Sequence, residues 1–211
     1  GSWRCRRSWS WCVPLWAANE VGGRRGPGSS PVEEPGERGT LDGYLADEHD
    51  SLEWLFAQDQ DPDGPMNYDS FIADIGALAM GATTYEWVRR HMAGSGEPWA
   101  YAMPTWVFTH RVLPALPGAD ITFTADPVPE VHAAMTRAAE GKDLWVVGGG
   151  DLAGQFADAG LLDRVVVSIA PVTLGAGRPL LPRRLNLRLA DVARNRSFVC
   201  AAYDVVGPLQ S

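Results

Sequence analysis

Three consecutive glycines, Gly148, Gly149 and Gly150, separate an apolar run at residues 144–147 from a helical pattern at 151–160. A strand that passes directly into a helix over backbone without side chains exposes helix N–H groups, and a phosphate can approach them closely. A tight turn that packs and binds nothing would have the same sequence. The glycines therefore predict either a pyrophosphate site or a structural turn.

A second turn of this kind is predicted at Gly81, which ends the apolar run 77–80 and precedes a helical pattern at 83–92. Thr83 and Thr84 could cap that helix or donate their hydroxyls to a phosphate. Two such turns, opposed across a central cleft, could hold both ends of a dinucleotide.

Thr109, His110 and Arg111 follow a third predicted strand, at 106–109. The planar fork of an arginine suits an additional phosphate, such as the 2′-phosphate of NADP. An ordinary solvated loop is the alternative. Residues 148–153 also satisfy the G-x-G-x-x-A pattern of Rossmann dehydrogenases, but they lie late in the chain and the next strand ends in Ala170-Pro171. Because that fingerprint needs an acidic residue there, the Rossmann interpretation is rejected.

The elements that would position these residues alternate along the chain. Apolar runs and alternating patterns predict strands at 77–80, 106–109, 121–124, 144–147, 165–169, 185–189 and 198–203, and helical periodicity or capping residues predict helices at 52–56, 68–74, 83–92, 129–140 and 151–160. This order predicts an α/β fold with a mostly parallel sheet and an antiparallel C-terminal edge. Ligands of such sheets collect at the carboxyl ends of the strands.

Composition restricts the classes of protein that the chain can represent. Its 211 residues are 45% hydrophobic and 21% charged, which predicts one globular domain of ordinary size. A net charge of −8 argues against nucleic-acid binding, and no apolar stretch is long enough to predict a membrane partner. Three scattered cysteines and four dispersed histidines predict a reducing, cytoplasmic location and no metal site.

Five motifs occur in the order expected for one known family: Thr40-Leu-Asp-Gly-Tyr-Leu-Ala46, Met80-Gly-x-x-Thr-Tyr-Glu86, Trp106-Val-Phe-Thr109, Trp145-Val-Val-Gly-Gly-Gly150 and Ser168-Ile-Ala-Pro-Val-Thr-Leu-Gly175. Over residues 40–206 the chain resembles the dihydrofolate reductase-like family, especially its branch related to the reductase domain of bacterial riboflavin biosynthesis. The resemblance implies a three-layer fold with helices on both faces of the sheet, and a homodimer as the candidate assembly.

The resemblance also implies roles for individual residues. The NADPH pyrophosphate would contact Gly81, Thr83, Thr84 and the turn Gly148, Gly149, Gly150, Asp151 and Leu152, the adenosine phosphate would contact Thr109, His110 and Arg111, and Leu45 and Ala46 would border the nicotinamide. A dihydrofolate reductase would carry a carboxylate at the start of its first helix to aid protonation of the pterin. Asp50 and Glu53 are the candidates for this catalytic role, with helix capping or surface charge as the alternative for each.

Residues 1–38 differ from the rest of the chain. They combine four tryptophans with a Gly/Pro/Arg-rich stretch, which predicts a poorly ordered N-terminal extension or linker before a reductase domain at 39–211. By resemblance, the first strand should run directly into Thr40, yet prolines and polar residues occupy 31–39. Either another segment, with 9–15 as the candidate, fills that central position or the strand has been lost.

These observations predict an NADPH-dependent reductase. It would transfer a hydride to a C=N or C=O bond of a small pterin- or pyrimidine-like heterocycle, with the cofactor carrying the chemistry. The alternative is a non-catalytic nucleotide-binding or scaffold protein whose first strand has degraded.

Overall fold

The computed structural model describes residues 9–11, 37–95 and 99–210. Nine strands form one sheet: β1 (Trp9–Trp11), β2 (Glu37–Thr40), β4 (Ile75–Gly81), β5 (Thr105–Phe108), β6 (Ile121–Thr124), β7 (Asp143–Val147), β8 (Arg164–Ala170), β10 (Leu185–Asn195) and β11 (Phe198–Pro208). A second, two-stranded sheet joins β3 (Tyr44–Ala46) to β9 (Arg178–Pro179). The helices are α1 (Glu53–Phe56), α2 (Tyr68–Ala73), α3 (Ala82–Ser95), α4 (Val128–Ala138) and α5 (Gly150–Asp158).

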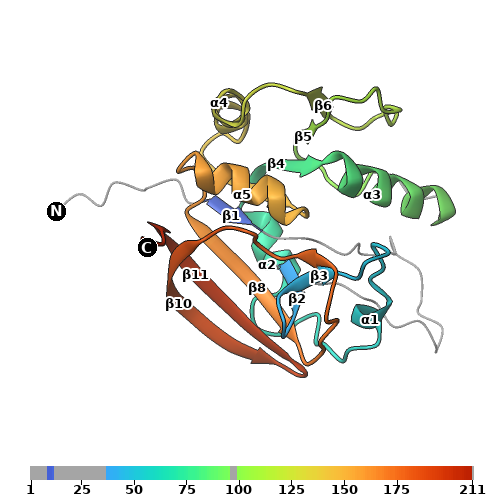
Figure 1. Ribbon diagram of the computed structural model, residues 1–211. Helices are drawn as coiled ribbons and strands as arrows, with labels where there is room; N and C mark the ends of the chain where they lie inside the picture. The colour runs from blue at the N-terminus through green and yellow to red at the C-terminus, as the bar shows by residue number, and fades with distance from the viewer. Residues whose placement is uncertain (1–8, 12–36, 96–98, 211) are drawn as a thin grey trace.

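The large sheet has the order β10-β11-β8-β1-β7-β4-β5-β6, with β2 also paired to β8 (Figure 1). From β6 to β8 every pair of neighbours is parallel, whereas β8, β11 and β10 are antiparallel to one another in turn. The predicted α/β fold, with a mostly parallel sheet and an antiparallel C-terminal edge, is confirmed.

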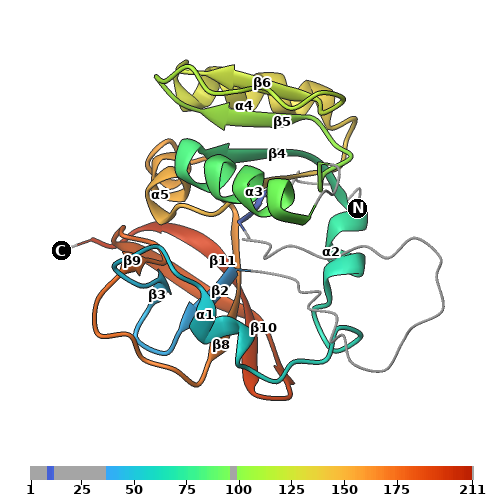
Figure 2. The same ribbon diagram turned by 90° about the vertical axis from the view of Figure 1, so that its right-hand side faces the viewer.

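Helices cover both faces of the sheet, and the alternation of side chains along each strand explains why. Ala77 and Ala79 of β4 belong to a core with α4 and α5, whereas Leu78 and Met80 belong to a separate core with α2 and Tyr85 of α3. Successive strand residues point to opposite faces, so a strand in the middle layer must be apolar throughout. In Figure 2 α3 lies in front of the sheet and α4 lies behind β5 and β6, which confirms the predicted three layers.

Two short strands together fill the position of the first strand. β1 lies between β7 and β8, with Ser10 and Trp11 opposite Arg164 and Val165. β2 continues along the same side of β8, where residues 37–40 lie opposite 167–170. The prediction that another segment near residue 9 fills the gap is therefore confirmed, and loss of the strand is excluded. The backbone groups of β7 and β8 that face this position thus find their partners in residues 9–11 and 37–40.

The charged part of β2 is buried against an aromatic ring. Arg38 is 3% exposed, and its guanidinium carbon lies 5.7 Å from the centroid of the Phe198 ring. Burial lowers the pKa of Arg38 to about 8, since removal from water disfavours the charged form. The expectation that polar residues exclude 31–39 from the sheet is thus wrong for residues 37–39, because an aromatic face can accept a guanidinium.

No helix among the described residues is long and apolar enough to cross a membrane. Large apolar side chains are nevertheless exposed on the antiparallel edge: Leu187, Leu189 and Val192 of β10, and Val199 and Val206 of β11. β10 is also the last strand of the sheet, so one row of its backbone groups has no neighbouring strand in the part of the chain that is described.

The homodimer predicted from the sequence would use this edge. We expect Leu189→Lys to reduce the dimer fraction measured by analytical ultracentrifugation, because a charge would enter the apolar contact. Val112→Lys is the matched control and should leave the dimer fraction unchanged. Val112 is fully exposed on a loop that does not belong to the antiparallel edge. A native chain that sediments as a monomer at high micromolar concentration would contradict the prediction.

Among the side chains that the structure describes, Trp145 of β7 is the largest that is fully buried, and its ring meets those of Tyr68, Phe71 and Tyr101 edge to face. Trp145→Ala should lower the free energy of unfolding by about 3–5 kcal/mol, because it leaves a cavity between β7 and α2. Urea denaturation measures this change. Val112→Ala, on the surface, should change the value by less than about 0.5 kcal/mol.

Candidate functional site

The two glycine turns predicted from the sequence lie in direct contact. β4 and β7 are neighbours, and Met80 lies opposite Val147 immediately before the two turns. A Cβ atom added to Gly148 would lie 2.5 Å from Oγ1 of Thr84. The turns therefore form one continuous surface at the carboxyl ends of adjacent strands. The expected separation across a cleft is wrong, because adjacent parallel strands bring their ends within one strand spacing.

Two conformational demands explain the triple glycine. Gly148 and Gly149 have φ values of 60° and 65°, a left-handed region that favours glycine. Gly150 begins α5 and needs space instead, since an added Cβ would lie 2.4 Å from the carbonyl oxygens of Pro179 and Leu180. The turn is thus structural at Gly148 and Gly150. At Gly149 it is exposed, and an added Cβ would meet no atom within 4 Å.

Backbone donors are available at the start of α5. Leu152 and Ala153 donate their N–H groups to the carbonyl oxygen of Gly149, at 2.9 and 3.3 Å. Among the described residues, the amides of Gly150 and Asp151 have no backbone acceptor. The side chain of Leu152 is buried in the core, so only its backbone could contribute to a site. The first amides of a helix are orphan donors and attract anions.

The turn at Gly81 is also open. A Cβ atom added there would meet no atom within 4 Å. α3 begins at Ala82, so Thr83 and Thr84 lie inside its first turn and neither is the N-cap. Thr83 is exposed and Thr84 is half-buried against Gly148. The hydroxyls of Thr83 and Thr84 therefore lie beside the open surface at Gly81, as binding of a phosphate there would require.

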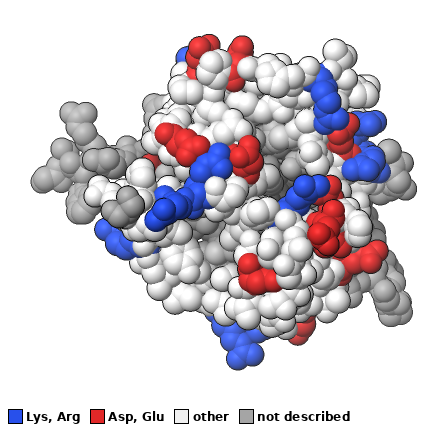
Figure 3. Space-filling view, viewed as in Figure 1, with Lys and Arg blue, Asp and Glu red and all other residues white. Residues whose placement is uncertain are grey.

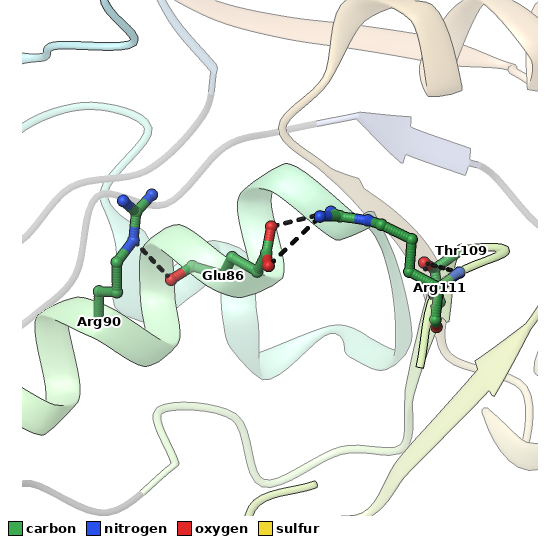
Figure 4. A network of polar contacts seen from close by, with 4 residues as sticks. All are labelled: Glu86, Arg90, Thr109 and Arg111. Carbon is green, nitrogen blue, oxygen red and sulfur yellow. Dashed lines mark hydrogen bonds and ion pairs between the residues drawn. The ribbon is translucent and has the colours of Figure 1, made fainter. Parts of the chain in front are cut away.

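The third strand end lies beside the same turn. Phe108, the last residue of β5, is opposite Gly81. In the following loop the N–H of Arg111 donates to Oγ1 of Thr109 at 3.0 Å, and the Arg111 guanidinium contacts both carboxylate oxygens of Glu86 at 2.8 and 3.4 Å (Figure 4). His110 is exposed. The structure thus brings the three predicted groups of cofactor residues to one edge of the sheet.

A carboxylate also lies at the start of α5. Gln155 and Arg183 donate to Asp151, at 3.0 and 3.1 Å, and these hydrogen bonds hold the pKa of the Asp151 carboxyl below its usual value. Arg183 reaches Asp158 as well, at 2.8 Å, and lies across Gly154, where a Cβ would be 2.7 Å from the guanidinium carbon. Figure 3 shows this pattern of basic side chains flanked by acidic ones over α5.

The residues expected near the nicotinamide belong to the small sheet. Leu45 and Ala46 of β3 are each 8% exposed, and Leu45 packs in the core with Leu152. A hollow opens beside them, lined by Tyr44, Glu48, Ala176, Gly177, Arg178 and Pro179. Because Pro179 also lies against Gly150, this hollow adjoins the triple-glycine turn.

Of the predicted catalytic carboxylates, Asp50 is already engaged. Arg178 donates to its two oxygens at 2.5 and 3.1 Å, and this contact holds the pKa of the Asp50 carboxyl below its usual value. A carboxylate kept ionised in this way is a poor proton donor near neutral pH. Glu53 is exposed in the first turn of α1, and its N–H donates to Oγ of Ser51. The catalytic role of either residue stays a prediction.

The sequence predicts no function for Glu86 or Arg178. Glu86 ends the motif that begins at Met80, and its position one turn into the helix after Gly81 is the local signal for it. Arg178 meets Asp50 only through the pairing of β3 with β9, which no local pattern predicts. The described residues contain no group of three or more His, Cys, Asp or Glu side chains placed to hold a metal ion.

Comparison with known proteins agrees with this architecture. The family model described as the RibD C-terminal domain matches residues 99–199. The chain is 26% identical to the uncharacterized protein YyaP of Bacillus subtilis over 178 residues, which are 79% of this chain and 89% of that protein. It is 23% identical to the uncharacterized protein YwjB of the same organism over 153 residues, 70% of this chain and 80% of that protein.

Two solved structures share the fold. A putative riboflavin biosynthesis protein from Shewanella sp. PV-4 has a TM-score of 0.67 at 22% identity, covering 80% of this chain and 95% of that one. A pyrimidine reductase-like protein from Corynebacterium diphtheriae has a TM-score of 0.55 at 14% identity, covering 80% and 89%. The family match and the shared fold confirm that this chain resembles the RibD C-terminal domain, within the dihydrofolate reductase-like fold.

Proposed function

We propose that this protein is an NADPH-dependent reductase. The single observation that carries the proposal is the contact between Thr84 and Gly148, which joins two open glycine turns into one surface; among the described residues, the Gly150 and Asp151 amides beside it have no backbone acceptor. A surface of backbone donors at the carboxyl ends of parallel strands suits a pyrophosphate. Similarity to a riboflavin biosynthesis protein and to a pyrimidine reductase-like protein supports the same reaction class.

The residues present fit the cofactor at both ends of this surface. Open space above Gly81 and Gly149, the Gly150 and Asp151 amides and the Thr83 and Thr84 hydroxyls suit the pyrophosphate. Thr109, His110 and Arg111 lie one strand away, where the loop after β5 would meet the adenosine phosphate. The Asp151 carboxylate would repel a pyrophosphate, but its ion pair with Arg183 neutralises that charge.

NADPH, when bound, supplies the hydride. The chain would orient the acceptor, and we place this acceptor in the hollow lined by Tyr44, Glu48 and Arg178, because Pro179 joins that hollow to the turn at Gly150. A flat pterin- or pyrimidine-like heterocycle with polar edges matches the mixture of an aromatic ring, a carboxylate and a guanidinium there. Asp50 would hold Arg178 in position, and Glu53 remains the candidate for proton supply.

The rival proposal is a non-catalytic nucleotide-binding or scaffold protein with a degraded first strand. Its premise of a lost strand is contradicted, since β1 pairs with both β7 and β8 in the centre of the sheet. Fluorescence titration separates the two proposals: we expect micromolar binding of NADPH, followed by loss of its near-ultraviolet absorbance when a pyrimidine or pterin substrate is added. No binding at high micromolar NADPH would reject the reductase.

Gly81→Ala tests the position of the pyrophosphate. The added methyl would enter open space, so the free energy of unfolding should change by less than about 1 kcal/mol. The same methyl would occupy space that a phosphate needs, and we expect NADPH affinity to fall at least about tenfold, a loss of about 1.4 kcal/mol.

Gly150→Ala is the contrasting variant. Its methyl would meet backbone oxygens of residues 179 and 180 at 2.4 Å, so thermal denaturation should show a large loss of stability. Unchanged NADPH affinity in Gly81→Ala would place the pyrophosphate elsewhere.

A further inference from the structure

The guanidinium expected to hold the cofactor's additional phosphate is occupied by a carboxylate of the same chain. Both terminal nitrogens of Arg111 contact Glu86: Nη2 lies 2.8 Å from Oε2, and Nη1 lies 3.4 Å from Oε1 (Figure 4). This is the two-pronged arrangement by which arginine binds carboxylates and phosphates. A phosphate that uses the same fork must first displace Glu86.

The backbone of each partner in this ion pair makes a further hydrogen bond. Arg111 is anchored by its backbone N–H to Oγ1 of Thr109, directly after β5. Glu86 lies near the start of α3, and its carbonyl oxygen accepts a hydrogen bond from Nε of Arg90 at 3.2 Å. The pair therefore connects the start of α3 to the loop after β5, on the side of the sheet edge that carries Gly81.

The pair is also accessible. The Arg111 side chain is 55% exposed and that of Glu86 is 30% exposed. An exposed ion pair in water contributes little to stability, so its exchange for a doubly charged phosphate is energetically feasible. The Glu86 carboxylate and the phosphate cannot both bind the two terminal nitrogens of Arg111, because two anions would then repel each other beside a single cation.

We propose that Glu86 is a positioning residue that competes with the cofactor's 2′-phosphate for Arg111 and so sets the preference between NADPH and NADH. The inference rests on the proposed function and deepens it. In the cofactor-free chain the Glu86 carboxylate occupies the two terminal nitrogens of Arg111. On binding, the phosphate takes the fork and the carboxylate moves to water, so part of the gain from the phosphate is offset by loss of the pair.

Glu86→Gln is the decisive variant, because it removes the competing charge and keeps the size of the side chain. We expect its dissociation constant for NADPH to fall about three- to fivefold, the most that release of an exposed ion pair can supply, while that for NADH changes by less than about 1.5-fold, since NADH has no 2′-phosphate. Glu86 as a purely structural support of the loop predicts the opposite sign, with weaker NADPH binding. The readout is nicotinamide fluorescence on titration of each full-length variant with each cofactor.

Arg111→Met and the double variant Glu86→Gln/Arg111→Met complete a thermodynamic cycle. Competition through Arg111 predicts that Arg111→Met loses the preference for NADPH and that Glu86→Gln then has no further effect. If Glu86→Gln improves NADPH binding equally in the Arg111→Met background, the carboxylate acts only by direct repulsion and the inference is overturned.

Glu130→Gln is the matched control, since it removes the same charge from α4 on the opposite face of the sheet. It should leave the ratio of the two dissociation constants unchanged. Thermal denaturation of each variant without cofactor verifies that it is folded. Binding of both cofactors with an unchanged ratio in Glu86→Gln would overturn this inference alone, whereas absence of any cofactor binding by the native chain would overturn the proposed function as well.

Discussion

The close approach of Thr84 to Gly148 is the constraint on which the site depends. It requires a residue without a Cβ at the end of β7, since a methyl there would lie 2.5 Å from the threonine hydroxyl. It also requires that β4 and β7 be adjacent and in register, with Met80 opposite Val147. Those strands are held by cores on both faces, in which Trp145 and Val147 pack on one side and Val146 on the other. The open surface is thus a consequence of a well-packed interior.

Charge distinguishes this site from a simple cationic phosphate pocket. Three arginines close to the proposed cofactor or substrate have carboxylate partners: Arg111 has Glu86, Arg178 has Asp50, and Arg183 has Asp151 and Asp158. In a chain with a net charge of −8, these pairs place guanidinium groups beside the proposed site without giving it an excess of positive charge. An anion that binds to one of these arginines must then replace the carboxylate. The backbone amides attract the anion without any such replacement.

Local patterns were sufficient where elements are long and buried on both sides. The apolar runs at 77–80 and 144–147 predicted β4 and β7, and the periodicity at 129–140 predicted α4, because burial imposes its period on the sequence. Local patterns failed for the first strand, which is divided between β1 and β2, and for the small sheet of β3 and β9. These strands are two to four residues long, and their partners are far away in the chain, so no window contains both.

The sequence by itself determined the fold class, the order of elements, and the two glycine turns with their hydroxyl neighbours, because φ preference, apolar period and the chemistry of Thr and Arg are properties of local residues. Only the tertiary structure decided that the turns touch, that β1 occupies the centre of the sheet, and that Arg111 is held by Glu86. Each of these facts joins residues from different strands or helices. Their distances follow from how the whole sheet is paired, which is information that no single segment carries.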